Sequence, residues 1–541
     1  MTWAGLNADY QAYLKSNWNS NILSGKSWVQ ALHDGVYEPT AEVIVSGAVF
    51  AGNVDVAAAS IAQVKGAGIE VSIYESIAIG TGLQANNPWL QELPDPISKV
   101  TWENVVAVSQ KTATELGIAQ GDIVNLTVGG KKVVGTSTDL EGGIPVLIQP
   151  GQANGTISIA LGYGRTAAGK SGNTGANAYP LVANGQYWAN DAKIEKIKDG
   201  YTLAQTQTHS TVMGRTAVVQ ESVLGEYVKD VKAGRFEPKI ETSEGEKKPY
   251  QITLWNGHEK KNHSWGMVID LNSCTGCGSC LVSCQAENNV SVVGKAEVAR
   301  AREMHWIRID RYYSSEMSHD EALAEKGIIG GYRELEIAAE NPEVVFQPMM
   351  CQHCSNAPCE TVCPVLATTH SSEGLNQMTY NRCIGTRYCA NNCPYKVRRF
   401  NWFKYFENDN FDFHMNNDLG RMVLNPDVTV RSRGVIEKCS MCVQRIQAGK
   451  LTAKKERRRP VDGEIQTACS QSCPTNAITF GDMLDNESEV SKMLAVEKEG
   501  RAFHVLEEIN VQPQLNYLTK IRNKDGVAKA THAEKKEAHH S

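Results

Sequence analysis

The first 273 residues of this 541-residue chain contain no cysteine, although the whole chain has 15. No run of about 20 apolar residues occurs, so no membrane-spanning helix is predicted. The N-terminus has neither the basic nor the apolar segment of a secretory signal peptide. Cys-x-x-Cys-His is also absent, so no c-type haem is expected on this chain. These absences predict that the chain is neither an integral membrane protein nor a cytochrome c.

Charge of neither sign dominates, because 54 lysines and arginines face 60 aspartates and glutamates, a formal net charge of -6. We therefore expect no nucleic-acid partner. The basic run at 454–459 is a local exception, but it lacks interleaved aromatic residues and predicts a solvated loop or a contact for an acidic partner. At about 150 residues per domain, the length predicts two to four domains.

The cysteine-free half contains short β-segments divided by glycine. Helical patterns in 1–40 and 54–64 flank a short apolar stretch at 41–50. Short strands with Gly-Gly turns then indicate a compact β-barrel-like unit. The expected strands are 69–74, 105–108, 123–128, 131–134 and 144–149, with a helix and turn at 111–121.

A glycine-rich segment follows, and 157–175 is predicted to be an irregular loop. Its glycine spacing fits neither the Walker pattern nor the dinucleotide fingerprint, so phosphate binding is disfavoured. Residues 191–250 are polar and rich in lysine, which predicts a linker. The charged segment 520–541 has few large apolar residues and predicts a mobile tail.

All the cysteines lie between 274 and 473, in four runs with the spacing of bacterial ferredoxins. In such a run, three thiolates of one short loop hold one cubane cluster, and a helix carries the fourth to another cluster. Three of the runs end in Cys-Pro. The runs are Cys274-x2-Cys277-x2-Cys280-x3-Cys284, Cys351-x2-Cys354-x4-Cys359-x3-Cys363, Cys383-x5-Cys389-x3-Cys393, and Cys439-x2-Cys442 with the later Cys469-x3-Cys473.

One ligand position lacks a thiol, because Thr386 stands where a cysteine would complete the third run. A threonine hydroxyl is not a thiolate and should not hold an iron corner. The 15 cysteines therefore divide into three sets of four and one of three. This count predicts three [4Fe-4S] clusters and one [3Fe-4S] cluster, with Thr386 at the vacant position.

Zinc is the main alternative, since paired Cys-x2-Cys also builds tetrahedral zinc sites. Tight sets of four that end in Cys-Pro are not typical of zinc ribbons, and 15 thiolates leave a remainder for sites of four. Disulfides are disfavoured as well, because the total is odd and cysteines three apart are poorly placed to bridge.

Three basic residues follow the third run, at Lys396, Arg398 and Arg399. They stand next to Cys393 in the sequence. We interpret them as residues that tune a cluster electrostatically.

The cysteine half resembles the four-cluster electron-transfer subunits of the molybdopterin oxidoreductase superfamily, such as those of polysulfide, nitrate and dimethyl sulfoxide reductases. It most closely resembles the iron–sulfur B subunit of bacterial alternative complex III, a membrane quinol:electron-acceptor oxidoreductase. The motifs that carry this likeness are Trp265-Gly-Met-Val-Ile-Asp-Leu-Asn-Ser-Cys274, Cys284-Gln-Ala-Glu-Asn-Asn289, His305-Trp-Ile-Arg-Ile-Asp-Arg311 and Tyr380-Asn-Arg-Cys383 through Phe400.

The cysteine-free half resembles the C-terminal part of a molybdopterin-enzyme catalytic subunit. The matching segments are Tyr74-Glu-Ser-Ile-Ala-Ile-Gly80, 86–96 and 149–165. The fold class implied is α+β multidomain, with a molybdopterin-oxidoreductase-like barrel and α/β region ahead of a double bacterial-ferredoxin-like domain. The expected boundaries are 1–190, a linker at 191–250, the four-cluster domain at 251–519 and the tail at 520–541.

The resemblance also implies a crossed arrangement of ligands. Cys274, Cys277 and Cys280 would share a cluster with Cys473. Cys284 would join Cys439, Cys442 and Cys469. Cys393 would join Cys351, Cys354 and Cys359, which leaves Cys363, Cys383 and Cys389 for the three-iron cluster.

The resemblance implies electron transfer rather than substrate chemistry. The expected partners are an integral membrane quinol-oxidising subunit, c-type haem subunits and an upstream molybdopterin-like half, because the family's iron–sulfur subunit is longer than this chain. The chain itself would bind neither molybdenum nor haem and would lie peripherally on the periplasmic side of the inner membrane. The alternative is the iron–sulfur subunit of a polysulfide- or tetrathionate-type molybdenum reductase.

Overall fold

The computed structural model describes residues 9–37, 52–62, 68–182, 185–253, 256–410 and 417–524. The chain forms two compact units, 1–65 and 66–541. The first unit contains helices α1 (Tyr10–Asn21), α2 (Trp28–Asp34) and α3 (Val54–Ala62), so helices occur where the sequence predicts them. The apolar stretch 41–50 lies outside the described residues.

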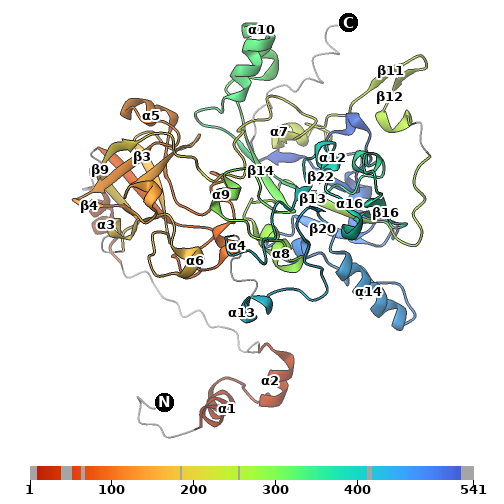
Figure 1. Ribbon diagram of the computed structural model, residues 1–541, viewed down its shortest axis with the longest axis horizontal. Helices are drawn as coiled ribbons and strands as arrows, with labels where there is room; N and C mark the ends of the chain where they lie inside the picture. Colours follow the sequence, from red (N-terminus) through yellow and green to blue (C-terminus); the bar gives the residue numbers. More distant parts are fainter. Residues whose placement is uncertain are drawn as a thin grey trace. The chain divides into compact units, whose positions relative to one another are not determined.

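The second unit begins with a six-stranded β-barrel, which confirms the barrel prediction. Its strands close a ring in the order β3-β6-β2-β7-β1-β9, because β3 also pairs with β9, and β4 adds to the edge of β3 (Figure 1). The strands are β1 (Ile69–Glu75), β2 (Val106–Val108), β3 (Ile123–Val128), β4 (Lys131–Lys132), β6 (Ile144–Ile148), β7 (Thr156–Leu161) and β9 (Trp188–Lys198). The smaller elements are α4 (Pro88–Gln91), α5 (Gln110–Leu116), β5 (Val134–Gly135), α6 (Gly169–Gly172) and β8 (Ala176–Asn177).

The prediction of an irregular loop from 157 onward is wrong for its first part. Strand β7 runs parallel to β1 and antiparallel to β2, and its Ile157, Ile159 and Leu161 are fully buried in the barrel core. The glycines that follow it serve close packing: Gly164 has a φ of +78°, and a Cβ there would lie 2.1 Å from the backbone nitrogen of Asn177. The glycine-rich segment therefore packs closely against β8 (Ala176–Asn177).

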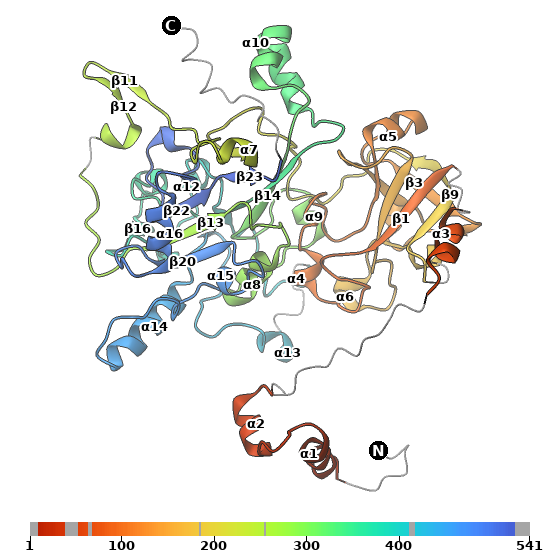
Figure 2. The ribbon, with the colours of Figure 1, turned by 180° about the vertical axis from the view of Figure 1, so that it is seen from behind.

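The cysteine half is built on a four-stranded sheet in the order β20-β13-β22-β21 (Figure 2). Its strands are β13 (Trp265–Asp270), β20 (Ile478–Asp482), β21 (Ala502–Phe503) and β22 (Leu515–Leu518). Three two-stranded sheets accompany it, namely β14 (Arg308–Tyr313) with β15 (Val344–Met349), β16 (Thr368–His370) with β17 (Asn376–Met378), and β18 (Arg399–Phe400) with β19 (Ile436–Glu437).

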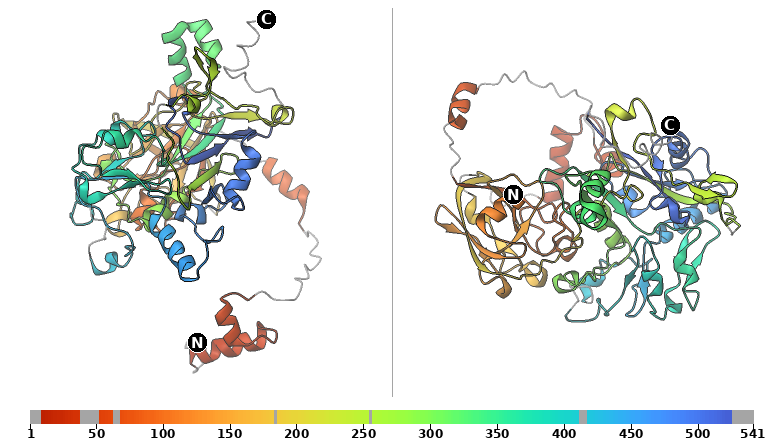
Figure 3. Two further views of the ribbon diagram at one scale, coloured as in Figure 1. Left: turned by 90° about the vertical axis from the view of Figure 1, so that its right-hand side faces the viewer. Right: turned by 90° about the horizontal axis from the view of Figure 1, so that it is seen from above.

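The helices of this half are mostly short. The longest, α10, contains a non-helical Gly327, and both α10 and α14 project from the sheets (Figure 3). The helices are α8 (Ser279–Glu287), α9 (Lys295–Val298), α10 (His319–Glu336), α11 (Pro358–Thr361), α12 (Tyr388–Asn391), α13 (Asp418–Arg421), α14 (Val443–Lys455), α15 (Ala468–Gln471) and α16 (Glu489–Glu497). No helix in the described ranges has the length and apolar character needed to span a bilayer.

The segments predicted as a linker and a tail contain regular structure. Strand β9 carries the barrel to residue 198, and β10 (Glu221–Val223), α7 (Leu224–Tyr227), β11 (Ile240–Thr242) and β12 (Gly245–Lys247) follow it. The tail does not begin at 520, because β23 (Lys520–Arg522) pairs in parallel with β10. Residues 525–541 lie outside the described part. The domain boundaries at 190 and 250 stay predictions.

Glu92 joins the barrel segment to the cysteine half. Its side chain accepts hydrogen bonds from the backbone N–H groups of Val293, at 3.1 Å, and Gly294, at 2.8 Å. The Trp102 indole donates a third at 3.1 Å. Complete burial raises the pKa of Glu92 to about 7, although these hydrogen bonds oppose the shift. The carboxyl therefore holds a proton more tightly in the folded chain than in the unfolded one.

Glu92→Gln should remove a pH dependence of local stability at this junction. Because burial raises the pKa of Glu92 from 4.5 to about 7, the folded state binds more protons between these values and its stability falls as pH rises, by about 3 kcal/mol in all. Hydrogen exchange at 293–294, corrected for intrinsic rates, should show protection decreasing from pH 5 to pH 8 in the parent protein and staying level in Glu92→Gln. The matched control is Glu70→Gln at an exposed position of β1. Level protection in the parent would contradict the prediction.

Candidate iron–sulfur centres

The structure brings the cysteines together in four groups. Group 1 is Cys274, Cys277, Cys280 and Cys473, and the Cys280 thiol interacts electrostatically with the other three. Group 2 is Cys284, Cys439, Cys442 and Cys469, in which the Cys284 thiol interacts with the other three. Group 3 is Cys351, Cys354, Cys359 and Cys393, in which the Cys354 thiol interacts with the other three. Group 4 is Cys363, Cys383 and Cys389, in which the Cys389 thiol interacts with the other two.

Each group joins distant parts of the chain, because the last cysteine of a run leaves the loop that holds the first three. Cys280 and Cys284 lie on successive turns of α8, which directs them to groups 1 and 2. Helix α15 carries Cys469 and packs against α8. The first and the fourth cysteine runs therefore come together where α8 packs against α15.

The four groups form a series. The Cys280 thiol of group 1 also interacts with Cys469 of group 2. The Cys439 thiol of group 2 interacts with Cys351 of group 3. Arg398 interacts with thiols of both group 3 and group 4. Groups 2 and 3 are buried throughout, whereas Cys274, Cys277 and Cys473 of group 1 and Cys363 and Cys383 of group 4 are half-buried.

The Cys-Pro endings share one backbone geometry. The residue three places after each such cysteine is left-handed: Leu366 has a φ of 51°, Lys396 of 52° and Asn476 of 52°. In two of the loops the next residue turns its N–H back to the cysteine, so that Ala367 donates to Cys363 Sγ and Ala477 to Cys473 Sγ, both at 3.2 Å. Proline thus ends the short helix, and the turn that follows supplies an N–H to the sulfur.

Side chains add further donors to the sulfur atoms, and the spacing of the cysteines gave no signal for them. Asn288 Nδ2 donates to Cys284 Sγ at 3.5 Å and lies 3.9 Å from Cys442 Sγ. Thr467 Oγ1 is 3.1 Å from Cys469 Sγ. Asn376 Nδ2 lies 3.8 Å from Cys359 Sγ. Hydrogen bonds of this kind stabilise the more negative, reduced state of a cluster and raise its potential.

The barrel segment contributes to the surroundings of group 1. Leu93 packs against Gly278 so closely that a Cβ on this glycine would lie 2.8 Å from Leu93 Cδ1. Lys99 is only 3% exposed. Burial lowers the pKa of Lys99 to about 8, while Cys274 acts in the opposite direction. The barrel therefore presents an apolar side chain and a buried amine to this group.

Burial makes the free thiols of the middle groups reluctant to ionise. It raises the pKa of Cys442 to about 12 and that of Cys359 to about 11, although Arg398 lowers the latter. Burial also raises the pKa of Cys363, but backbone N–H groups outweigh it and hold that pKa below its ordinary value. Buried thiolates in such numbers need metal to take their charge, and iron–sulfur clusters with Cys ligands fit these residues.

Single metal ions fit the groups less well than clusters. Within the described ranges, no three His, Cys, Asp or Glu side chains converge on one metal-ion position. Each thiolate of a cluster binds a different iron, so its ligands stand farther apart than those around one zinc ion.

Thr386 and the basic run at 454–459, which the sequence analysis selected, both lie at the surface. Thr386 is exposed on the loop between Cys383 and Cys389 of group 4. The basic run at 454–459 ends α14 and is partly neutralised, since Arg458 pairs with Glu464 at 2.7 Å.

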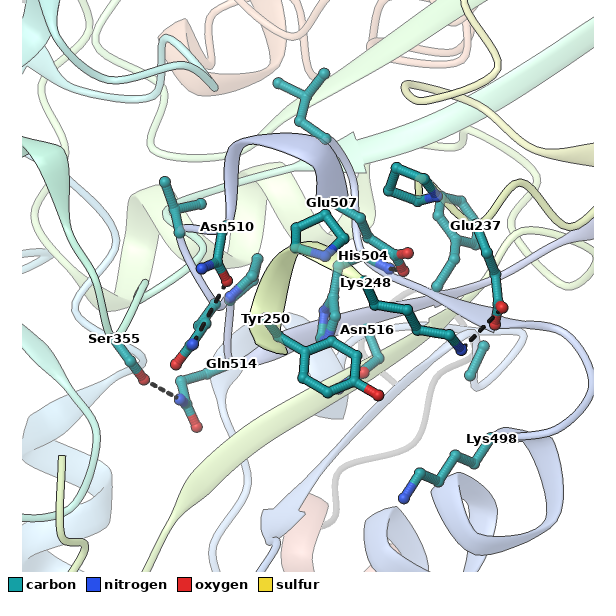
Figure 4. A pocket seen from close by; sticks show the side chains of 18 of the residues that line it. Glu237, Lys248, Tyr250, Ser355, Lys498, His504, Glu507, Asn510, Gln514 and Asn516 are labelled. Atoms are coloured by element: carbon teal, nitrogen blue, oxygen red, sulfur yellow. Dashed lines mark hydrogen bonds and ion pairs between the residues drawn. The ribbon is translucent and has the colours of Figure 1, made fainter. Parts of the chain in front are cut away.

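A cavity of about 630 Å³ lies near group 3, where Ser355, next to Cys354, contacts Gln514 (Figure 4). No cysteine lines this cavity, so it is separate from the four groups.

Comparison with known protein families gives two matches in the cysteine half. Two models described as 4Fe-4S dicluster domains match residues 273–367 and 342–409. These ranges hold groups 3 and 4 completely, together with the loop and helix that start groups 1 and 2. The protein therefore contains ferredoxin-like 4Fe-4S domains.

Known relatives are iron–sulfur subunits of reductases and oxidoreductases. The chain is 36% identical over 260 residues to a menaquinone reductase iron–sulfur cluster-binding subunit of Nitratidesulfovibrio vulgaris, covering 47% of this chain and 89% of that protein. It is 32% identical over 255 residues to a putative dimethyl sulfoxide reductase iron–sulfur subunit of Halobacterium salinarum, covering 47% and 79%. It is 29% identical over 252 residues to an Hdr-like menaquinol oxidoreductase iron–sulfur subunit 1 of Archaeoglobus fulgidus, covering 43% and 77%.

Asn288→Leu should lower the reduction potential of the group 2 cluster alone. The change removes the side-chain donor to Cys284 Sγ, a loss of about 1 kcal/mol or a roughly fivefold change in the reduced-to-oxidised ratio at fixed potential. A redox titration followed by EPR would measure it, with the other three clusters as internal controls. Equal shifts in all four clusters, or none in group 2, would contradict this role for Asn288.

Proposed function

Since the chain belongs to the family of iron–sulfur electron-transfer subunits with 4Fe-4S dicluster domains, we propose that it relays electrons from quinol oxidation in a membrane subunit to c-type haem subunits. The observation that carries this proposal is the series of four cysteine groups, buried in the middle and half-buried at both ends. Buried middle positions protect the electrons from solvent, and the half-buried ends allow exchange with partners.

The ligands follow from the groups. Groups 1, 2 and 3 each hold a [4Fe-4S] cluster through four thiolates. Group 4 holds a [3Fe-4S] cluster through Cys363, Cys383 and Cys389, with Thr386 at the vacant position. When bound, the clusters supply one-electron carriers. The chain's own residues fix their order, exclude water from the middle two and donate hydrogen bonds to their sulfur atoms.

The surface around group 4 suits the membrane subunit. Leu366, Ile384 and Tyr388 are 63%, 66% and 56% exposed there. Arg382 and Arg387 are exposed beside them. Apolar side chains with arginine are typical of the centre of a protein interface. We therefore assign this end to quinol oxidation.

The surface around group 1 is polar, with Thr275, Thr475 and Asn476 exposed, and the half-buried Lys520 acts electrostatically on Cys274. Polar, small surfaces are typical of transient electron-transfer contacts. We assign this end to the c-type haem partner. The complex would be an alternative complex III, with this chain on the periplasmic side of the inner membrane beside an upstream molybdopterin-like half. The barrel of this chain would bind no molybdenum.

The second candidate is the iron–sulfur subunit of a polysulfide- or tetrathionate-type molybdenum reductase. The similarity to a dimethyl sulfoxide reductase iron–sulfur subunit favours it. In that case electrons would leave through group 1 to a molybdenum subunit instead of a haem. Molybdenum in the purified complex, with no haem c, would decide for this second function.

The purified complex should contain about 15 irons per copy of this chain and an oxidised three-iron EPR signal. Thr386→Cys should complete the fourth ligand of group 4, raise the count to about 16 and abolish the three-iron signal. Iron analysis and EPR of the oxidised protein measure both. A parent protein with about 16 irons and no three-iron signal would overturn the assignment of group 4.

Ile384→Glu should slow reduction by quinol at least about tenfold, because a carboxylate would be desolvated at the proposed membrane-subunit contact. Reduction by dithionite should not change. Val228→Glu, at a position 76% exposed and remote from the four groups along the chain, is the matched control. Stopped-flow measurement of cluster bleaching gives both rates. An unchanged quinol rate in Ile384→Glu would place the quinol side elsewhere.

A further inference from the structure

Arg398 is a buried guanidinium that has no carboxylate partner in the described part of the chain. It is 6% exposed and lies five residues after Cys393, next to β18. Its Nη2 donates to Thr368 Oγ1 at 2.8 Å and lies 3.3 Å from Met378 Sδ. Its Nε and Nη1 are buried and make no hydrogen bond to the protein. Two donors and one full positive charge are therefore left without a protein partner.

Such an arrangement needs compensation. A buried charge that is neither paired nor hydrogen-bonded costs several kcal/mol, and buried donors almost always have acceptors. Two neighbouring arginines have a carboxylate for their charge, since Arg399 pairs with Glu303 at 2.8 Å and Arg431 with Glu437 at 2.6 Å, although Arg431 Nε is also a buried donor without an acceptor in the described part of the chain. Arg398 is the exception among these three, so its partner is something that the protein atoms alone do not supply.

The groups that face Arg398 electrostatically are cysteine thiols from two cysteine groups. Cys359, Cys351 and Cys393 belong to group 3, and Cys389 belongs to group 4. Burial lowers the pKa of Arg398, but these thiols outweigh it and hold that pKa above its ordinary value. The influence is mutual, because Arg398 lowers the pKa of Cys389 and Cys359 against the effect of burial.

The position of Arg398 also follows from the repeated loop geometry. Thr368 stands five residues after Cys363, as Arg398 does after Cys393, so the two contacting residues occupy matching places in two Cys-Pro loops. The loop that ends group 3 thus reaches the loop that contributes to group 4. One side chain at this contact can act on both groups at once.

We propose that Arg398 is a positioning residue shared by the clusters of groups 3 and 4, where its fixed positive charge and its two free donors stabilise the reduced state of both. This rests on the proposed function, because it requires clusters in those two groups. Reduction adds negative charge to a cluster, so a nearby cation raises its potential. The consequence is that the potentials of the two neighbouring clusters rise together.

EPR-monitored redox titration of the purified complex tests this with three substitutions. Arg398→Met removes the charge and the donors, Arg398→Gln keeps donors without charge, and Arg398→Lys keeps the charge. Arg398→Met should lower both potentials so that the reduced-to-oxidised ratio at fixed potential falls at least tenfold, about 59 mV for one electron. Arg398→Gln should give a smaller shift of the same sign, and Arg398→Lys the smallest. The clusters of groups 1 and 2 should not move.

Lys404→Met is the matched control, because Lys404 is an exposed cation six residues after Arg398 and solvent screens its charge. It should change the ratio less than threefold. Iron content and EPR amplitude come first: a parent protein without clusters in groups 3 and 4 would refute the proposed function itself. With clusters present, a shift confined to one cluster, shifts in all four, or none would overturn the role of Arg398. If Arg398→Met does not load iron, Arg398→Lys and Arg398→Gln are compared instead. Lower potentials of the group 3 and group 4 clusters in Arg398→Gln than in Arg398→Lys would support the role of Arg398, and equal potentials would overturn it.

Discussion

Burial of thiolate charge is the constraint on which the cysteine half depends. Groups 2 and 3 place eight cysteines in the core, where the free thiols ionise poorly. Metal must take up that charge, and each set of ligands spans distant segments, as Cys280 and Cys473 do in group 1. A cluster at each group would therefore act as a cross-link, and metal binding would contribute to folding as it does at structural metal sites.

The Cys-Pro loops that hold these cysteines repeat one backbone arrangement. A short helix carries a cysteine, a Cys-Pro pair follows the helix, and a left-handed residue then turns the chain. In the loops of Cys363 and Cys473 this turn brings an N–H to the sulfur. The turn is made by Leu366, Lys396 and Asn476, only the last of which is a residue that tolerates positive φ well. Strain at two of three positions persists because the surrounding structure fixes it, as is usual at functional sites.

The sequence predicted those features that depend on local spacing. The cysteine runs, the helices of 1–40 and most barrel strands are of this kind, because each is set by residues near one another in the chain. Strand β7 was missed although Ile157, Ile159 and Leu161 alternate along it, because the glycines that follow it indicate a loop. Regular structure inside the segments assigned as linker and tail was not predicted, because β9 and β23 find partners far away in sequence. The donors Asn288 and Thr467 carry no spacing signal, because only the folded chain brings them to the sulfur atoms.

The buried arginines of the cysteine half differ in the partner that balances their charge. Arg308 pairs with Asp310 at 2.7 Å and Arg431 with Glu437, so the carboxylates of the protein neutralise these cations. Arg398 has no such carboxylate in the described structure, and the groups that act on it electrostatically are cysteines of groups 3 and 4. A sequence shows all three arginines alike. The distinction exists only in three dimensions, because it depends on which anion lies at the end of each buried side chain.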